Sequence, residues 1–194
     1  MKRGSGILMH ISSLPGKYGI GTLGKSAYAF ADFLKQSGQK YWQILPLGHT
    51  GYGDSPYQCF SAYAGNPYFI DLEVLREEGL LEEEMLKLLD EEDSCEEVRF
   101  EQLFYQRYPI LRKAYERGKE RLQVDIEAFR NENVSWIEDY SLYMAVKGDM
   151  GNKSWIEWDE SIKQRTPEAL AYYKEKLKNE INFWVFVQYE FYNQ

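Results

Sequence analysis

The sequence has few cysteines and few prolines, and it has no long hydrophobic run. Two of its 194 residues are cysteines, Cys59 and Cys95, and their spacing fits neither a metal knuckle nor a disulfide framework. The first apolar run ends before His10, which is too short for a signal-peptide core or for the ~20 apolar residues of a membrane span. We therefore expect a cytoplasmic protein with no membrane partner and no cysteine-bound metal.

Positive charge is also in short supply. The sequence has 23 lysines and arginines against 31 aspartates and glutamates, which gives a net charge of -8. Twelve of the acids lie within residues 73–97. Binding to nucleic-acid phosphates depends on lysine and arginine, so we expect no nucleic-acid partner. With 44% hydrophobic residues and 6 prolines, the composition is that of a globular protein rather than a disordered one.

The first third of the chain combines glycines with two short apolar runs. Residues 6–11 are apolar and lead into Ser-Ser-Leu-Pro-Gly, which is typical of a buried strand that enters a loop. Residues 25–37 repeat apolar side chains at helical spacing, and Gly38 follows as a C-cap. Residues 41–45 form a second buried strand that stops at Pro46. Strand, helix and strand in this order predict a βαβ unit with parallel strands and a right-handed crossover.

The rest of the chain has helical patterns with few breaks. Apolar residues, Leu88 among them, line one face of an acidic segment at residues 81–89. Ser135–Glu138 matches a capping box that would begin another helix. Thr166–Glu168 gives an N-cap, a proline at the first helical position and an acid in the first turn, and the apolar period after it continues to the end of the chain. These patterns predict mainly helical structure after about residue 73.

The expected organisation has three parts. Residues 1–72 begin an α/β domain, residues 73–166 form a helical subdomain, and residues 167–194 form one long helix. Two parallel strands cannot form a stable sheet by themselves, because parallel sheets are buried on both faces and need several strands. The last helix is strongly apolar and lacks a stop signal. We interpret the chain as a fragment of a larger α/β protein.

One glycine motif suggests nucleotide binding. Gly19–Gly24 matches the G-x-G-x-x-G fingerprint between a strand and a helix. Residues 12–18 separate the first glycine from the strand, however, and the end of the next strand lacks the acid that would bind a ribose. We therefore favour a glycine-rich turn that leads into the helix, with nucleotide binding as a distant alternative.

A second glycine-rich segment, residues 51–67, has a composition suited to sugars. Its tyrosines, hydroxyls and amides alternate with glycines, which places flat aromatic faces beside short hydrogen-bonding groups. A sugar ring offers an apolar C–H face for stacking and a rim of hydroxyls for hydrogen bonds. The segment therefore predicts carbohydrate binding, with an ordinary structured Ω-loop as the alternative. In a parallel barrel it would lie at the C-terminal end of a strand, where active sites form.

Three segments, residues 3–24, 41–73 and 139–158, closely resemble the N-terminal part of the 4-α-glucanotransferases, the amylomaltase or disproportionating-enzyme family. The resemblance implies an α/β fold: the N-terminal part of a (β/α)8 TIM barrel, with its first two parallel strands and a helix, plus an inserted, mainly helical subdomain. It also implies retaining transfer of an α-1,4-glucan segment from a donor to an acceptor sugar, with no metal and no organic cofactor.

The resemblance further implies roles for three residues of the loop. Tyr57 resembles the tyrosine that stacks beneath the donor sugar, Ser55 a donor-side hydroxyl, and Tyr52 a tyrosine at an accessory glucan contact. Packing of Tyr57 into the core of the loop is the alternative. Retaining transfer needs two carboxyl groups ~5 Å apart, and in this family these lie on later strands. We expect neither Asp54 nor Asp71 to be the nucleophile, and we assign no catalytic residue within the chain.

Three other residues are expected to have structural roles. We predict that His10 is a hydrogen-bonded core residue within the first strand. Trp155 and Trp158 could stack on sugars, but packing of the inserted helices is the preferred interpretation.

Together these observations predict the N-terminal segment of an α-glucan transferase that is inactive without its catalytic carboxylates. Its expected partners are a maltooligosaccharide or other α-glucan and the remainder of the same polypeptide. The alternative is a non-catalytic α-glucan-binding or interaction module. The last helix, which ends without a stop signal, favours the transferase.

Overall fold

The computed structural model describes residues 3–87, 89 and 97–194, and the chain forms two compact units. Unit 1 comprises residues up to Gly118 together with Glu190–Gln194, and unit 2 comprises Lys119–Tyr189. The division predicted from the sequence, into residues 1–72, 73–166 and 167–194, refers to the complete barrel protein and stays a prediction. Among the described residues, no helix combines the length and apolar character that crossing a membrane requires.

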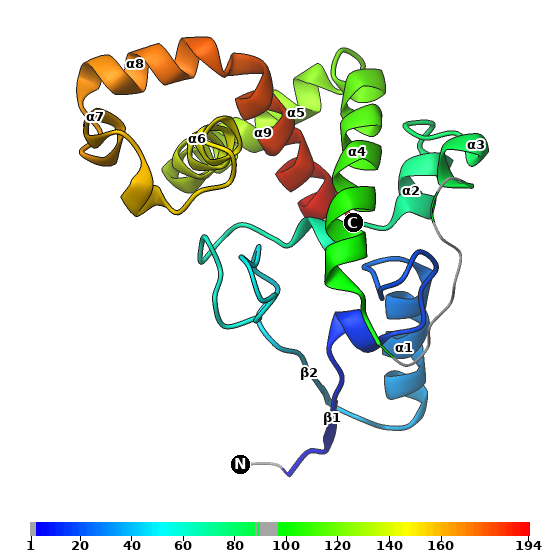
Figure 1. The fold of residues 1–194 in the computed structure, drawn as a ribbon. Coiled ribbons are helices and arrows are strands. Elements are labelled where there is room, and N and C mark those ends of the chain that lie inside the picture. The colour runs from blue at the N-terminus through cyan, green and yellow to red at the C-terminus, as the bar shows by residue number, and fades with distance from the viewer. Residues whose placement is uncertain (1–2, 88, 90–96) are drawn as a thin grey trace. The chain divides into compact units, whose positions relative to one another are not determined.

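Unit 1 begins with the predicted βαβ unit (Figure 1). Strand β1 spans Gly6–Leu8, helix α1 spans Lys25–Gln36 and strand β2 spans Tyr41–Gln43. The two strands are parallel, with Gly6 opposite Tyr41. The predicted parallel pairing and the predicted helix are therefore confirmed, and Gly38 follows α1 with a positive φ of 71°.

Both strands are shorter and more exposed than the sequence predicted. The chain leaves β1 for the short 3-10 helix η1, Ile11–Ser13, instead of remaining extended to residue 11. More than half of the surface of Leu8 and of Tyr41 is exposed, so the prediction of buried strands is wrong for the described chain. The physical reason is that a parallel sheet becomes buried only when several strands and helices on both faces cover it.

The core of unit 1 lies between the βαβ unit and the segments that follow it. Buried side chains from η1, α1 and the 3-10 helix η2, Pro67–Phe69, pack with one residue of the long helix α4, Phe100–Gly118. The buried members of this cluster are Ile11, Leu14, Ile20, Ala27, Tyr68, Phe69 and Leu103. This packing joins the start of the chain to a helix almost a hundred residues later.

The acidic helix expected over residues 81–89 is much shorter in the structure, and another short helix precedes it. Helix α2 spans Leu72–Glu77 and helix α3 spans Glu83–Leu86. Leu88, which was predicted on the apolar face of this segment, lies outside the described residues. The part of the chain after residue 73 that the structure describes is otherwise helical, as predicted, and its residues 98–150 form no strand.

Helix α4 carries a completely buried cation. Arg107 donates a hydrogen bond to the Ile70 carbonyl at 3.4 Å. Burial lowers the pKa of this guanidinium to about 10, against the opposing influence of Asp71, Tyr68 and Tyr18. Arg107 therefore remains charged at neutral pH inside unit 1.

Unit 2 is built from helices and includes most of α9, whose end belongs to unit 1. Its elements are α5 (Gln123–Glu132), α6 (Val134–Asp149), the 3-10 helix η3 (Trp155–Glu157), α7 (Glu160–Lys163), α8 (Pro167–Lys176) and α9 (Lys178–Asn193). Inside this unit, the Gln188 side chain donates to the Tyr140 hydroxyl at 3.2 Å, and both side chains are buried. Helical packing around aromatic side chains therefore defines unit 2.

The helix boundaries of unit 2 correct two predictions and confirm one. The start of α8 is as predicted, because the Thr166 side chain accepts a hydrogen bond from the Ala169 amide. The single long helix is instead broken at Leu177, between α8 and α9. The capping box predicted at Ser135 is wrong, since Ser135 lies inside α6 and Asn133 precedes the helix.

Candidate functional site

The segment from residue 48 to residue 66, called here the tyrosine loop, follows β2 and returns on itself. Isolated antiparallel bridges join Gly48 to Gly65 and Thr50 to Cys59. The His49 amide donates to the Ala64 carbonyl at 3.0 Å, which continues the pairing. The loop is therefore a closed backbone structure whose two ends lie side by side.

The tip of the tyrosine loop contains two successive residues with positive φ. Gly53 has φ 91° and Asp54 has φ 50°, and the Asp54 amide donates to the Gly51 carbonyl at 3.1 Å. The left-handed region is accessible to glycine without a steric penalty and is tolerated by aspartate. The Gly-Asp pair thus allows the tight turn that precedes Ser55.

Side-chain hydrogen bonds connect this tip to the base of the loop. The Thr50 hydroxyl donates to Asp54 Oδ1 at 3.3 Å and accepts from Asn66 Nδ2 at 3.3 Å. Asn66 Oδ1 in turn accepts from the Tyr68 amide at 3.0 Å. Burial raises the pKa of the Asp54 carboxyl above its ordinary value, and the hydrogen bond from Thr50 opposes part of that rise.

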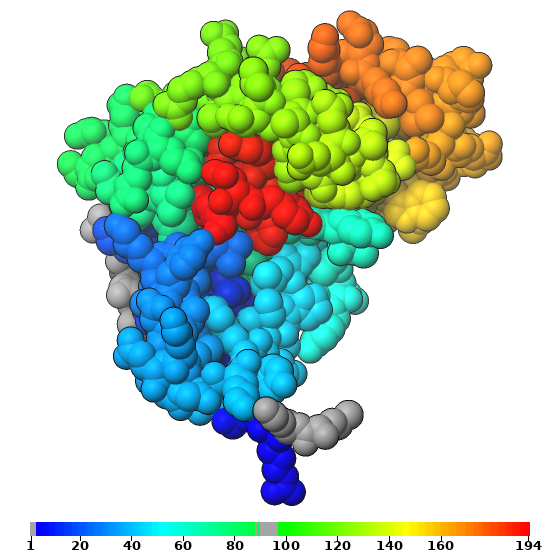
Figure 2. Space-filling view, turned by 180° about the vertical axis from the view of Figure 1, so that it is seen from behind, coloured from blue at the N-terminus to red at the C-terminus, as the bar shows by residue number. Residues whose placement is uncertain are grey.

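Two further contacts fix the sides of the loop. His49 is buried, and its Nε2 lies 3.0 Å from the hydroxyl of Tyr108 on α4. The Tyr192 hydroxyl, near the end of α9, donates to the Tyr63 carbonyl at 2.6 Å. Figure 2 shows the end of the chain, in red, beside the blue and cyan segments of unit 1. The loop is therefore held from both sides by residues of its own unit.

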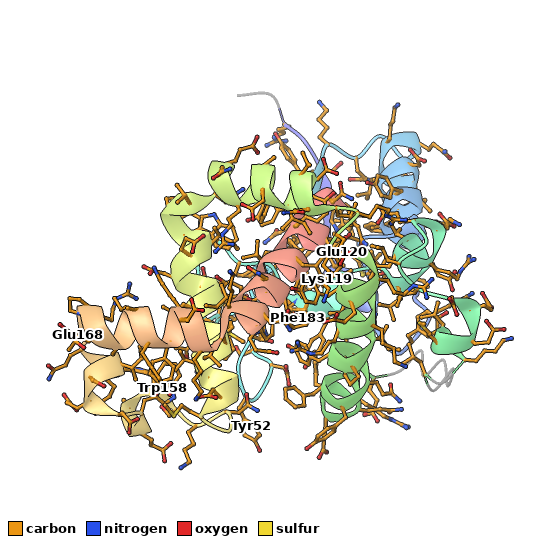
Figure 3. The ribbon with its side chains drawn as sticks, turned by 90° about the horizontal axis from the view of Figure 1, so that it is seen from above. Tyr52, Lys119, Glu120, Trp158, Glu168 and Phe183 are labelled. Atoms are coloured by element: carbon orange, nitrogen blue, oxygen red, sulfur yellow. The ribbon has the colours of Figure 1, made fainter. Side chains whose placement is uncertain are left out.

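The tyrosine side chains of the loop face outward. Tyr52 is fully exposed and stands at the edge of its loop in Figure 3, and 73% of Tyr57 is exposed. Ser55 is partly exposed and accepts a hydrogen bond from the Tyr57 amide at 3.4 Å. All three predicted site residues thus lie on one loop. Their exposed rings and hydroxyl can offer stacking surfaces and hydrogen bonds to a sugar.

The exposure of Tyr57 decides one alternative and reveals a residue that the sequence reasoning missed. Because its ring is mostly exposed, Tyr57 does not pack into the core of the loop. Tyr63 is also exposed, and its amide donates to Ser61 Oγ at 3.1 Å. The signal for Tyr63 was its position in the same glycine- and tyrosine-rich segment.

Both aspartates considered as nucleophiles have structural partners. Asp71 Oδ1 accepts hydrogen bonds from the Glu73 and Val74 amides at 2.8 and 3.2 Å, so Asp71 caps α2. Asp71 Oδ2 accepts from the Thr22 hydroxyl at 2.5 Å. Among the described residues, no group of three His, Cys, Asp or Glu side chains could hold a metal ion.

Two glycines of the nucleotide-like motif are explained by the close approach of other parts of unit 1. A Cβ atom at Gly21 would lie 2.0 Å from the Ile11 carbonyl oxygen, and one at Gly24 would lie 1.8 Å from Asp71 Oδ2. Only residues without a side chain fit there. The absence of side chains at Gly21 and Gly24 lets η1 and the cap of α2 lie close to the turn before α1, so the motif has a structural role.

The structure places the remaining candidate residues as follows. His10 lies just after β1, with its ring edge-on to Phe69 at 5.4 Å, and its Nδ1 has no hydrogen-bond partner among the described residues. The prediction of a hydrogen-bonded strand residue is therefore wrong.

The two tryptophans of unit 2 differ in burial. Trp158 is buried against Tyr143, with ring centroids 5.3 Å apart, which confirms a packing role. Trp155 is half-exposed, so packing does not explain it.

Comparison with known proteins assigns the chain to a family. Residues 9–194 match the sequence model of a family described as 4-alpha-glucanotransferase. The chain belongs to this family. It is 50% identical over 186 residues to a 4-alpha-glucanotransferase of Clostridium butyricum, covering 96% of this chain and 38% of that protein. With a 4-alpha-glucanotransferase of Thermus thermophilus it shares 42% identity over 198 residues, covering all of this chain and 39% of that protein.

A solved structure of the same family has a closely similar fold. The amylomaltase of Streptococcus agalactiae, solved in complex with acarbose, superposes with a TM-score of 0.94 at 45% identity, over 99% of this chain and 39% of that one. This likeness shows a helix-rich α/β fold with two parallel strands. The chain spans less than two fifths of the length of these relatives.

Proposed function

We propose that this chain is the N-terminal part of a 4-alpha-glucanotransferase that moves α-1,4-glucan segments from a donor to an acceptor sugar. The observation that carries the proposal is the family match over residues 9–194, together with an ordered loop that exposes tyrosine rings. In this proposal β1, α1 and β2 are the first elements of a (β/α)8 barrel. The tyrosine loop would then lie at the C-terminal end of the second strand, where barrel active sites form.

The proposed role of the loop is to bind the donor glucan. Tyr57 would stack on the apolar face of a donor sugar, Ser55 would hydrogen-bond a sugar hydroxyl, and Tyr52 would contact a glucan at an accessory position. The similarity to an amylomaltase solved with acarbose supports sugar binding. Retaining transfer also requires a carboxylate nucleophile and a carboxylic acid/base ~5 Å apart, which we assign to the remainder of the polypeptide.

The test is a transfer assay on the full-length polypeptide that carries this chain. With maltotriose as the only substrate, we expect glucose together with a series of longer maltooligosaccharides, because each transferred segment leaves one shortened donor. Release of glucose and maltose without any longer product would indicate hydrolysis and contradict the proposal. Binding of maltooligosaccharides without any new product would support the non-catalytic glucan-binding module instead.

A further inference from the structure

One buried threonine connects the base of the tyrosine loop with its tip. Only 9% of Thr50 is exposed, and its hydroxyl bonds to Asn66 at the base and to Asp54 at the tip. Asn66 is itself buried and caps η2 through the Tyr68 amide. The hydroxyl of Thr50 is thus the middle member of a three-residue polar connection that starts in the core of unit 1.

The tip has little core packing of its own. Gly53 and Asp54 both have positive φ, in the left-handed region that glycine adopts freely and aspartate tolerates. The side chains of Tyr52 and Tyr57 are exposed and add no core packing. The backbone bonds within the tip are local: the Asp54 amide donates to the Gly51 carbonyl at 3.1 Å and the Gln58 amide to the Ser55 carbonyl at 3.0 Å. These bonds shape the turn, whereas the Thr50 hydroxyl connects Asp54 to the base of the loop.

We propose that Thr50 is a positioning residue that orders the tip of the tyrosine loop so that Ser55 and Tyr57 are held ready for a glucan. The inference rests on the proposed function. Ser55 directly follows Asp54 in the sequence, and Tyr57 comes two residues later, so a displaced Asp54 displaces both. A loop ordered before the ligand arrives loses less conformational entropy on binding, and its affinity is correspondingly higher.

The partial burial of Asp54 predicts how the tip moves when the Thr50 hydroxyl is lost. The Asp54 carboxyl is partly buried, which disfavours its ionised form, and the Thr50 hydroxyl is the donor that opposes this effect. Without that donor, the carboxylate at the tip gains free energy by moving into water. Loss of the Thr50 hydroxyl therefore favours a tip that turns outward, away from the position that presents Ser55.

Unit 1 contains a matched control for this substitution. Thr22 is 7% exposed, and its hydroxyl also donates to an aspartate, Asp71 Oδ2, at 2.5 Å. Thr22 lies outside the tyrosine loop, between η1 and α1. Replacing either threonine by valine removes a hydroxyl–carboxylate bond and keeps the shape of the side chain; Thr50→Val also removes the bond from Asn66. The two variants differ in which part of unit 1 they loosen.

The experiment compares Thr50→Val, Thr50→Ser and Thr22→Val in the full-length transferase. We measure kcat and KM for maltotriose transfer, the unfolding temperature, and amide hydrogen exchange at residues 51–60. For Thr50→Val we expect faster exchange at these amides and a loss of roughly tenfold in kcat/KM, because the tip must be ordered on each binding event. Thr50→Ser should restore both properties to within about threefold, since the serine hydroxyl can replace that of threonine.

The control separates positioning from a general loss of stability. Thr22→Val should lower the unfolding temperature but leave exchange at residues 51–60 and kcat/KM within about twofold of the wild type. Equal losses of kcat/KM in Thr50→Val and Thr22→Val would overturn the proposal, as would unchanged exchange at the tip in Thr50→Val. Faster exchange without any loss of kcat/KM would also overturn it.

Two provisions keep the result interpretable. If Thr50→Val does not fold, Thr50→Ala removes the same hydroxyl with a smaller side chain, and the same changes are expected. If the wild-type polypeptide shows no transfer, the proposed function fails, whereas exchange at residues 51–60 still decides whether Thr50 orders the tip. The failure of one proposal is thus distinguishable from the failure of the other.

Discussion

At the scale of single residues, the exposed rings of Tyr57 and of the two other tyrosines of the loop, Tyr52 and Tyr63, are the surfaces that the proposed function assigns to a sugar. Their place on one loop could be predicted from the sequence, because Gly, Tyr and Ser alternate within a short segment. The connection through Thr50 could not be predicted. It depends on Asn66, sixteen residues away, returning to the same point in space, and no local pattern specifies that approach.

The first prediction concerns the ring of Tyr57 in the full-length transferase. Losing the ring in Tyr57→Ala should cost roughly 1–3 kcal/mol of transition-state stabilisation, because apolar C–H surface of the sugar is no longer buried. Losing only the hydroxyl in Tyr57→Phe should cost roughly 0.5–1.5 kcal/mol. Measuring kcat/KM and the unfolding temperature of both variants tests this. Equal losses would assign the contact to the hydroxyl and contradict stacking.

The second prediction concerns Glu73 and acid stability. Burial raises the pKa of the Glu73 carboxyl, but hydrogen bonds from Tyr18, Arg76 and Lys17 outweigh it and lower the pKa from 4.5 to about 2. A carboxyl whose pKa is lowered by folding stabilises the native state above its unfolded pKa, and this contribution is lost as the pH falls from about 4.5 to about 2. Its side chain is 23% exposed, so we expect a contribution of about 1–3 kcal/mol.

The measurement is thermal unfolding of the wild type and of Glu73→Gln from neutral pH down to about pH 2. The wild type should be more stable at neutral pH, and the difference should shrink as the medium is acidified. If the difference between the two proteins stays constant with pH, the ionised carboxylate of Glu73 is not the source of the stability.

At the scale of secondary-structure elements, local signals succeeded where a single residue type enforces a boundary. Helix α1 ends before Gly38, and α8 begins at Thr166 with Pro167 in its first turn, as expected. The break at Leu177 has no such signal, because leucine neither caps nor breaks a helix. Helix propensity therefore does not account for the break.

The capping box shows how a local motif can be assigned to the wrong place. Ser135 and Glu138 have the right spacing, but the chain already turns at Asn133, whose side chain bonds to the Phe129 carbonyl and to Trp136 Nε1. A capping box is found instead at η3, where Ser154 pairs with Glu157. The motif is necessary for such a cap, but the surrounding hydrogen bonds decide which copy is used.

The third prediction tests the N-cap of α2. Replacing Asp71 by alanine removes the acceptor for the Glu73 and Val74 amides and for the Thr22 hydroxyl, so the free energy of unfolding should fall by about 1–3 kcal/mol. Asp139→Ala is the control, because its ion pair with Arg165 is exposed and should contribute less than about 0.5 kcal/mol. Chemical denaturation of both variants measures the difference. Equal effects would show that Asp71 does not act as a cap.

At the scale of the whole molecule, the two parallel strands are the clearest sign that more polypeptide belongs to the fold. Their pairing was predictable, since strand, helix and strand follow one another closely. Their exposure was not, because burial depends on elements that are distant in sequence: Leu8 and Tyr41 remain open to solvent. In the proposed barrel, further strands and helices of the transferase would cover them.

The account is tested most directly by assaying maltotriose disproportionation with the purified 194-residue chain alone. We predict no transfer products, because a loop that binds and orients a sugar cannot replace a nucleophile and an acid/base. Longer maltooligosaccharides that increase in proportion to the amount of the chain, and that still form with Asp54→Ala, would show that catalytic residues lie within these residues. That result would contradict the assignment of the chemistry to the remainder of the polypeptide.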